Sequence, residues 1–198
     1  MILKNKLSDD EIRRVAELHH TLLSDGFLAS FGKDFLYLVY KQIYLAVDAT
    51  IIVYISNSEV VGFIAGGIGL KNIYMQLLKH PVQLCSCIIP KLLKMSFMVK
   101  LYASLTRKIR KNNTKSEIMD AELYSICVTK EYQGSFVAEA LYDGLCEFFK
   151  HSNKDAFMIV VGSKLSRAQS FYIKQGATPI GSLEQGFGKQ SIIFKQSV

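Results

Sequence analysis

ICVTKEYQGSFVA, residues 126–138, decides the fold, because a short apolar strand breaks there into a turn of small residues and then opens a helix. The first N–H groups of a helix have no partner within it, and the helix dipole adds to their attraction for anions. A strand that leads into a helix in this way predicts a phosphate-binding turn, of the kind that cradles a pyrophosphate.

Length and composition indicate a folded, basic protein. The chain has 198 residues, 49% of them apolar and 21% charged, which fits a single domain, residues 1–198, with a substantial core. Its formal charge of +7 favours a polyanionic partner such as a phosphorylated cofactor, nucleic acid or an anionic membrane surface. We expect no nucleic-acid partner, because no recognised reading motif accompanies the basic residues.

The four cysteines indicate reduced, structural thiols. They include no C-x-x-C pair and have no histidine at ligand spacing, so we expect no metal site. Reduced thiols are typical of the cytoplasm, and charges interrupt the apolar runs before they reach the length of a signal peptide or a membrane span. We therefore expect a soluble, cytoplasmic protein. These cysteines are Cys85, Cys87, Cys127 and Cys146.

Periodicity near the start of the chain predicts two helices and a hairpin. Ser8 and Glu11 form a capping box before a helix over residues 9–23, and a second helix follows it. β-Branched runs at residues 50–56 and 60–65 predict an antiparallel hairpin.

Residues 71–115 form a distinct basic segment, expected to be a helical insertion. The segment is apolar and carries ten Lys or Arg but no Asp or Glu. Pro81 and Pro90 are expected to divide it into two or three helical pieces. Two interpretations stay open. The segment is a helical lid or flank whose basic face is solvated or leans toward an anionic cofactor, or it is an amphipathic patch that docks on a membrane or a protein partner.

Strands and helices alternate in the last part of the chain. We expect strands over residues 121–128 and 156–161, and helices over residues 137–150 and 165–175, with Gly176 ending the second helix. Two further strands, near residues 177–183 and 190–194, are expected to close the sheet. The fold class is therefore α/β with a mixed sheet. The residues expected on the inner face of the first of these helices are Val137, Leu141, Leu145 and Phe148.

Two motifs in this part of the chain resemble those of one enzyme family. A strand ending at Val128 is followed by Gln133 and Ala138, in the pattern [Q/R]-x-x-G-x-[G/A]. A second pattern, N-x-x-A-x-x-[F/L]-Y-x-K-x-G, is met by Ala168, Phe171, Tyr172, Lys174 and Gly176. Both resemble the GNAT superfamily of acyl-CoA N-acyltransferases. The resemblance implies a mixed, mostly antiparallel, splayed β-sheet flanked by helices, with residues 71–115 as an insertion.

The resemblance also implies acetyl-CoA as the acyl donor, with no metal. A bulge in the strand over residues 121–128 would free backbone groups, which bind the pantetheine arm in the manner of an added strand. These groups belong to Ile126, Cys127 and Val128. The pyrophosphate would lie on the N–H groups of the following turn. The turn residues are Gln133, Gly134, Ser135, Phe136, Val137 and Ala138.

The chain departs from the family pattern at two positions. Phe136 stands where glycine is usual, and Leu165 stands where asparagine is frequent. Phe136 either points outward or fills the cradle and obstructs CoA. We expect the outward orientation, because Gly134 and Ser135 keep the turn small, and the Ser135 hydroxyl is expected to add a donor.

Tyr172 and Glu122 are the candidate catalytic residues. The resemblance implies that Tyr172 protonates the departing CoA thiolate as a general acid; the alternative is an aromatic packing residue. Glu122 is a candidate base or substrate contact, and otherwise an exposed strand carboxylate. Strand alternation would place Glu122 and Tyr124 on the same face as Ile126, although a bulge would shift this parity.

Three further residues are expected to be structural. His19 and His20 lie on the first helix, and each is expected to be satisfied by a hydrogen bond or to face solvent. Cys127 is expected to pack in the core, because direct transfer in a ternary complex needs no covalent cysteine.

The resemblance thus implies an N-acetyltransferase that moves an acetyl group from acetyl-CoA to a primary amine by direct attack. The acceptor is a small amine, such as an amino sugar or a polyamine, or a protein amine, and the protein is a monomer or a homodimer. The alternative is a non-catalytic GNAT-like binding module. In that case the CoA cradle is obstructed, and residues 71–115 dock on a partner or a membrane surface.

Overall fold

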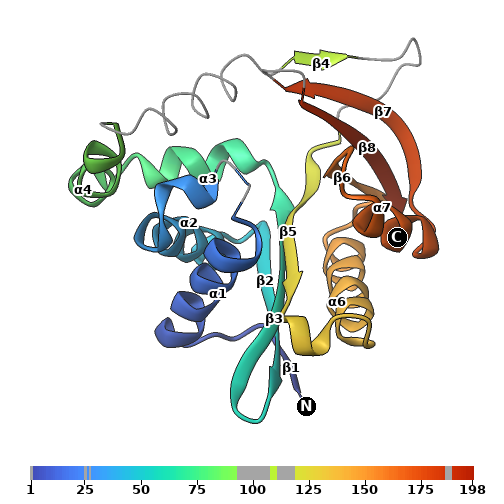
Figure 1. Ribbon diagram of the computed structural model, residues 1–198, viewed down its shortest axis with the longest axis horizontal. Helices are drawn as coiled ribbons and strands as arrows, with labels where there is room; N and C mark the ends of the chain where they lie inside the picture. The colour runs from blue at the N-terminus through green and yellow to red at the C-terminus, as the bar shows by residue number, and fades with distance from the viewer. Residues whose placement is uncertain (1, 25, 27, 93–107, 111–118, 186–188) are drawn as a thin grey trace.

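Helices cover both faces of a mixed β-sheet in the computed structural model, as Figure 1 shows. The structure describes residues 2–24, 26, 28–92, 108–110, 119–185 and 189–198. In chain order, the elements are β1 (Ile2–Lys4), α1 (Asp9–Leu22), η1 (Leu28–Phe31), α2 (Lys33–Leu45), β2 (Ala49–Ser56), β3 (Glu59–Ile68), α3 (Leu70–Leu77), α4 (Pro81–Leu92), β4 (Lys108–Arg110), β5 (Ala121–Val128), η2 (Lys130–Tyr132), α6 (Val137–His151), β6 (Ala156–Gly162), α7 (Ser166–Lys174), β7 (Thr178–Gln185) and β8 (Lys189–Ser197).

The described strands form an eight-stranded sheet in the order β1-β2-β3-β5-β6-β8-β7-β4. Neighbouring strands pair antiparallel, with the exception of β5 and β6, which run parallel. This arrangement confirms the expected α/β fold with a mixed, mostly antiparallel sheet. The parallel pair lies in the interior of the strand order, and one of its two strands, β5, leads into the predicted phosphate-binding turn.

Local sequence signals set the ends of several elements. The capping box before α1 is present, because the Ser8 Oγ accepts from the Glu11 N–H at 3.3 Å and the Glu11 carboxylate accepts from the Ser8 N–H at 2.7 Å. Asn57 and Ser58 both have positive φ, 50° and 63°, which is the conformation of a two-residue hairpin turn between β2 and β3.

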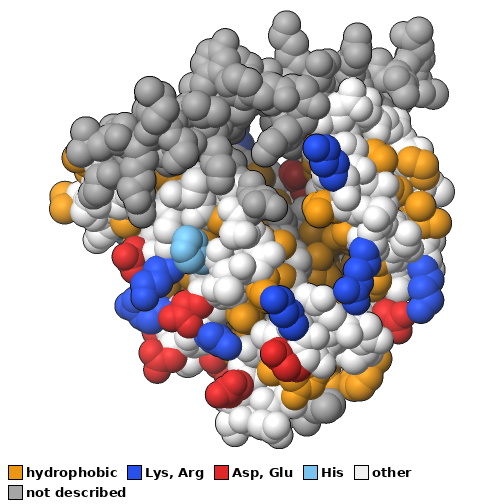
Figure 2. All heavy atoms as spheres, viewed as in Figure 1, with side chains coloured by type: hydrophobic (Ala, Val, Ile, Leu, Met, Phe, Trp, Pro, Cys, Tyr) orange, Lys and Arg blue, Asp and Glu red, His pale blue; other side chains and the backbone are white. Residues whose placement is uncertain are grey.

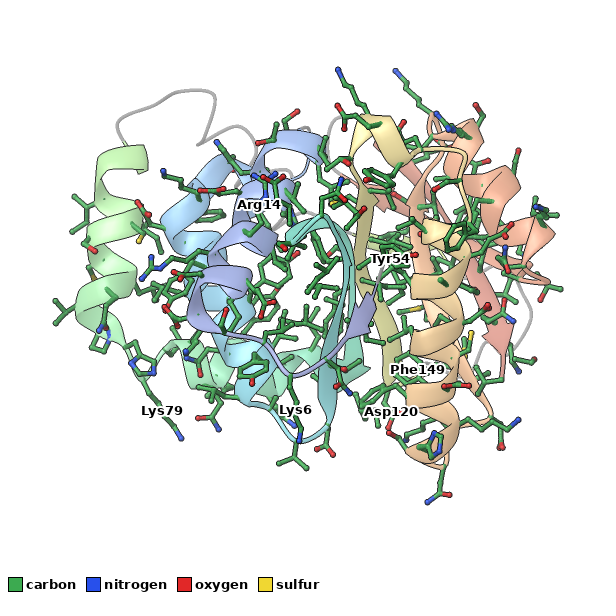
Figure 3. All side chains as sticks on the ribbon, turned by 90° about the horizontal axis from the view of Figure 1, so that it is seen from below. Lys6, Arg14, Tyr54, Lys79, Asp120 and Phe149 are labelled. Atoms are coloured by element: carbon green, nitrogen blue, oxygen red, sulfur yellow. The ribbon has the colours of Figure 1, made fainter. Side chains whose placement is uncertain are left out.

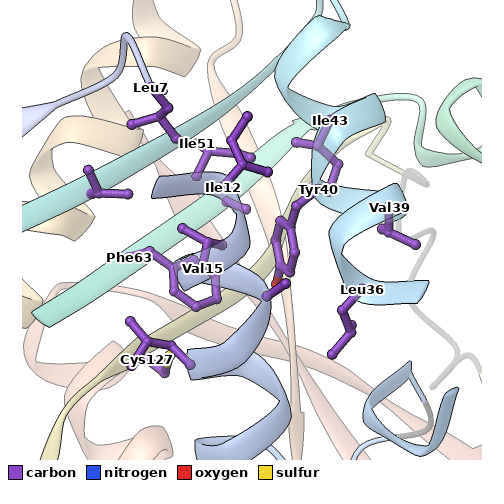
Figure 4. Packing of buried hydrophobic residues seen from close by; sticks show 14 of the residues in the cluster. Leu7, Ile12, Val15, Leu36, Val39, Tyr40, Ile43, Ile51, Phe63 and Cys127 are labelled. Carbon is purple, nitrogen blue, oxygen red and sulfur yellow. The ribbon is translucent and has the colours of Figure 1, made fainter. Parts of the chain in front are cut away.

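Two hydrophobic clusters hold the helices on the sheet. In the first, α1 and α2 pack on one face, where Tyr40 stands between the two helices and Phe63 and Cys127 line the sheet (Figure 4). In the second, α6 and α7 pack on the opposite face. Figure 3 shows α6 across the sheet from α1 and α2, with Tyr54 and Phe149 on the α6 side.

The buried face of α6 differs from the expected one at its last position. Val137, Leu141 and Leu145 are buried as expected, but the fourth member of the row is Phe149, and Phe148 is half-buried. A strict i, i+4 row drifts slowly around a helix and leads from Leu145 to Phe149.

The basic segment is only partly helical where it is described. Pro81 separates α3 from α4, as expected, but Pro90 lies inside the last turn of α4. Residues 108–110 form β4, which pairs antiparallel with β7, so the expectation of helical pieces is wrong there. The rest of the expected insertion, residues 93–107 and 111–115, lies outside the described residues. No helix in the described chain has both the length and the hydropathy that a membrane span requires.

A buried chain of three polar side chains joins α1, α2 and β5. The Tyr40 Oη lies 2.6 Å from the His19 Nδ1 and 2.7 Å from the Ser125 Oγ, and all three residues are buried. Because a hydroxyl both donates and accepts, Tyr40 satisfies both neighbours at once. His20, one residue on, is exposed and lies with its Nδ1 3.1 Å from the Ala29 carbonyl. These contacts are consistent with the structural roles expected of the two histidines.

Replacing Tyr40 with Phe tests this chain. The Tyr40→Phe variant leaves two buried polar groups without their partner, so its unfolding free energy is expected to fall by about 1–3 kcal/mol in urea denaturation. Tyr44→Phe, at a partly buried position of the same helix, serves as the matched control and is expected to lose less. Equal losses in the two variants would contradict the assigned role of Tyr40.

The same chain predicts a pH dependence of stability. Burial, reinforced by the neighbouring His20, lowers the pKa of His19 from its ordinary 6.5 to about 4. Between these values the unfolded chain binds a proton at His19 that the folded protein does not. The unfolding free energy is therefore expected to fall as the pH falls through this window, by up to about 1.4 kcal/mol per pH unit. Denaturation at several pH values should show a much weaker dependence in His19→Gln, whereas His20→Gln, which removes only the smaller of the two causes, should keep most of it.

Candidate active site

A β-bulge interrupts the pairing of β5 with β3. Ala65 lies opposite Ser125, and the next residue of β3, Gly66, lies opposite Leu123, which leaves Tyr124 as the extra residue of β5. A bulge bends the strand and re-aims the side chains around it. The bulged residue lies two positions before Ile126, the first of the residues predicted to bind the pantetheine arm.

The bulge places Glu122 and Tyr124 on the opposite face from Ile126. Tyr124 packs against the first hydrophobic cluster, beside α1 and α2, whereas Leu123 and Ile126 pack with the second. The prediction from simple alternation, that Glu122 and Tyr124 share a face with Ile126, is therefore wrong. The bulge moves both residues to the opposite face, which is the alternative stated above. Glu122 lies on the Tyr124 side, where its negative charge adds to the effect of burial and raises the pKa of the Tyr124 hydroxyl.

β5 and β6 separate after a short parallel contact. In their register, Glu122 lies opposite Met158 and Leu123 opposite Ile159. Beyond Leu123, the described residues of the two strands form no further pair. β6 continues to Gly162 in pairing with β8 alone. Figure 2 shows the surface hollowed over a hydrophobic floor in this part of the molecule, between the β5 and α7 of Figure 1.

The separation leaves an open edge of backbone along the end of β5. The Thr129 N–H donates to the Val61 carbonyl of β3 at 2.8 Å, whereas the Val128 carbonyl accepts from the Gln133 side chain at 3.2 Å on the other side. By alternation, the N–H and C=O of Ile126 point to the open edge, and those of Cys127 point to β3. Of the three residues predicted to hold pantetheine, Ile126 therefore offers both of its groups.

Residues 133–138, the predicted cradle, hold three N–H groups that have no acceptor in the described chain. Gln133, Ser135 and Val137 donate their N–H groups within the turn, to the Lys130 carbonyl, the Tyr132 carbonyl and the Ser135 Oγ. In the described chain, the N–H groups of Gly134, Phe136 and Ala138 have no acceptor. Gly134 has φ +83°, a conformation that favours glycine. The predicted cradle thus offers three donors from six residues.

The Ser135 hydroxyl has a structural role in this turn. It donates to the Tyr132 carbonyl at 2.6 Å and accepts from the Val137 N–H at 3.3 Å. Its proton is therefore engaged within the chain, and the additional donor expected from Ser135 is absent from this arrangement.

Arg167, at the start of α7, lies beside the turn. Its Nη1 donates to the Gln133 Oε1 at 3.2 Å, and its Nη2 is 3.8 Å from the position that a Cβ on Gly134 would occupy. Gln133 thus links the end of β5 to α7, and a guanidinium stands next to Gly134, one of the three residues whose N–H has no acceptor. The motif comparison missed Arg167. The signal available in the sequence was a cation directly before Ala168 in the second motif.

The two departures from the family pattern have distinct surroundings. Phe136 is 55% exposed and packs edge-to-face on Tyr54 of β2, with the ring centroids 5.8 Å apart, which is the outward orientation that we expected. Leu165 is exposed and makes no side-chain cap for α7. Gln169 instead ties this helix to the end of β6, donating to the Gly162 and Ser163 carbonyls at 3.0 and 2.9 Å.

Tyr172 lies deep in the second cluster and is 4% exposed. Its ring packs among those of Tyr142, Phe171 and Phe194. Burial raises the pKa of the Tyr172 hydroxyl well above its ordinary value, so the phenol keeps its proton at neutral pH. Burial also raises the pKa of the Cys127 thiol to about 12, which leaves Cys127 a protonated packing residue.

The two candidate catalytic residues lie on opposite faces of the sheet. Tyr172 is on the α6 and α7 side, whereas Glu122 and Tyr124 are on the side of α1 and α2. The Tyr124 Oη is buried and has no hydrogen-bond partner in the described chain. An unpaired buried hydroxyl costs free energy and marks a place where a ligand group can bind. Over the residues that the structure describes, no cluster of His, Cys, Asp and Glu is arranged to hold a metal ion.

Comparison with known proteins shows a likeness of structure alone. No family model matches the sequence, and no curated protein matches it either. Among solved structures, an N-acetyltransferase from Staphylococcus aureus Mu50 superposes with a TM-score of 0.64 at 10% identity, covering 99% of this chain and 97% of that one. A GNAT-family acetyltransferase from Streptococcus pneumoniae gives 0.59 at 13% identity, with 100% and 98% covered.

A third structure includes the cofactor. Arabidopsis thaliana NAA60, solved in complex with acetyl-CoA, superposes with a TM-score of 0.60 at 14% identity and covers 100% of this chain and 98% of its own. At such identities the likeness establishes the fold. The chain has the fold of the GNAT acyl-CoA N-acyltransferases, as its two motifs predict.

Proposed function

We propose that this chain with the GNAT fold is an N-acetyltransferase that transfers an acetyl group from acetyl-CoA to a primary amine. The open edge of β5 at Ile126, followed by the free N–H groups of the turn before α6, carries this proposal. An amide-rich pantetheine arm fits the edge as an added strand, and a pyrophosphate fits the turn. The two features follow one another along the chain in the order in which CoA carries these groups.

The outward orientation of Phe136 favours the enzyme over the alternative of an obstructed binding module. The ring lies against Tyr54, and the N–H groups of Gly134, Phe136 and Ala138 remain without acceptors in the described chain. Arg167 adds a positive charge beside them. Charge-assisted hydrogen bonds to phosphate are stronger than neutral ones, so we assign Arg167 to the CoA phosphates.

The opposite placement of Tyr172 and Glu122 suits direct transfer. With the thioester held in the opening between β5 and β6, the amine approaches from the Glu122 side and the thiolate departs toward Tyr172. Glu122 accepts the amine proton, directly or through water, and the neutral amine nitrogen attacks the acetyl carbonyl. As the C–N bond forms, the C–S bond breaks and Tyr172 gives its proton to the sulfur. The attacking nitrogen loses its remaining extra proton, which returns to the Tyr172 oxygen directly or through water. The Tyr124 hydroxyl is available to hold the acceptor amine.

The setting that we propose is cytoplasmic, where acetyl-CoA is made and thiols stay reduced. All four cysteines are free in the structure. The acceptor is a small amine or a protein amine, and the reaction requires no metal.

Tyr172→Phe tests the general acid. The variant is expected to lower kcat by about 10²-fold and to bind acetyl-CoA as the wild type does, because it loses only the proton donated in the transition state. The measurement is acetyl-CoA consumption across a panel of amines, with binding followed by calorimetry. Tyr142→Phe is the matched control, because its hydroxyl lies in the same cluster but donates to Gln196. An unchanged kcat in Tyr172→Phe would remove Tyr172 from the mechanism.

Arg167→Ala tests the phosphate site. Loss of a charged donor is expected to weaken acetyl-CoA binding by about tenfold or more, and the difference should shrink as the salt concentration rises. Binding of acetyl-pantetheine, which lacks the pyrophosphate, is expected to be unaffected. Lys174→Ala removes a cation from the far end of the same helix and is the control. Equal weakening for both ligands would place Arg167 outside the phosphate site.

A further inference from the structure

α3 and α4 carry an exposed apolar surface that the proposed active site does not use. Tyr74, Met75 and Leu78 are exposed on α3 and directly after it, and Val82 and Ile89 of α4 are 79% and 59% exposed. We call these five side chains the α3–α4 patch. They make up half of the large exposed hydrophobic side chains of the described chain, and all lie within residues 74–89.

α4 is apolar on both faces. Leu84 and Ile88 pack against the first hydrophobic cluster, whereas Val82, Cys85 and Ile89 follow the outer face at spacing i, i+3, i+7. The sequence has no charged residue from 81 to 90. Gln83 and Ser86 are also exposed on this helix. Exposed apolar stripes on a helix are normally covered, so the outer face of α4 is suited to contact with another apolar phase.

The charged residues of α3, α4 and the loop between them are all basic. Lys71, Lys79 and His80 are exposed there, and Figure 3 shows Lys79 projecting from the molecule near the base of α4. The sequence holds no Asp or Glu from residue 60 to residue 116. A matching partner therefore has an apolar interior behind a negatively charged exterior.

We propose that the α3–α4 patch docks on an anionic lipid bilayer, with α4 lying along the interface. Its aliphatic side chains enter the boundary between headgroups and acyl chains, while the lysine ammonium groups stay at headgroup level. Protein interfaces are instead enriched in Trp, Tyr, Phe, Met and Arg. The patch has one Tyr and one Met but no Trp, Phe or Arg, and its other three members are aliphatic.

The patch adjoins the side of β5 to which we assign the acceptor. Tyr74 lies near enough to Tyr124 to raise the pKa of its hydroxyl. Docking would thus bring the Glu122 and Tyr124 side of the site next to the bilayer. This consequence rests on the proposed function, but the docking itself does not.

A single-tryptophan reporter tests the docking in the full chain, which contains no Trp. The emission of Val82→Trp is expected to shift to shorter wavelength with vesicles that contain phosphatidylglycerol. The shift should be absent with phosphatidylcholine vesicles and should weaken as salt rises. Ile173→Trp, an exposed position on α7 at the other side of the molecule from α4, is the control (Figure 1). No shift at Val82→Trp, or an equal shift at Ile173→Trp, would overturn the proposal.

Acidic substitutions give a second, independent measurement. The double variant Val82→Glu/Ile89→Glu changes exposed side chains and is expected to reduce co-sedimentation with the anionic vesicles by about tenfold or more, whereas Ile173→Glu keeps wild-type binding. Tyr172→Phe should also bind vesicles normally, so loss of acetyl transfer and loss of docking are separable. Unchanged sedimentation of the double variant would overturn the proposal. A wild-type dimer that becomes a monomer in the double variant would also overturn it and assign the patch to a second copy of the chain.

Discussion

The short parallel contact between β5 and β6 is the constraint on which the rest of the site depends. After Leu123 the two strands have no register pair in the described chain, yet backbone N–H and C=O groups need partners. The Gln133 side chain supplies one for the Val128 carbonyl, whereas the groups of Ile126 face the opening. Because these groups belong to the backbone, the site needs few specific side chains. A site of this kind is compatible with the low identity, 10–14%, between this chain and the solved structures named above.

Packing and hydrogen bonds in the core fix the elements on both sides of this opening. Ser125, beside the bulge, is tied through Tyr40 to His19, so β5 is fixed to both α1 and α2. Buried polar networks rigidify a structure when every member is satisfied. On the other face, α6 and α7 pack on the sheet, and the link from Gln133 to Arg167 joins the turn to α7. Both sides of the opening are therefore built on rigid elements.

Sequence patterns predicted most of the fold, because capping, periodicity and turn chemistry act locally. The capping box at Ser8, the hairpin at Asn57 and the helix after Phe136 all follow from nearby residues. The predictions that failed concern features that depend on residues distant in the sequence. β4 is defined by pairing with β7, more than seventy residues on, and the face of Glu122 depends on a bulge set by its register with β3. The role that we propose for Arg167 depends on the packing of α7 beside the turn at Gly134.

Hydrogen exchange at individual amides, followed by NMR with and without acetyl-CoA, tests the central claim most directly. Saturating acetyl-CoA is predicted to slow exchange at Ile126 and at Gly134, Phe136 and Ala138, whose N–H groups face the opening or the cradle. The Cys127 amide, which points to β3, should change little and serves as an internal reference. Unchanged exchange at Ile126 and in the turn under saturating acetyl-CoA would contradict the account.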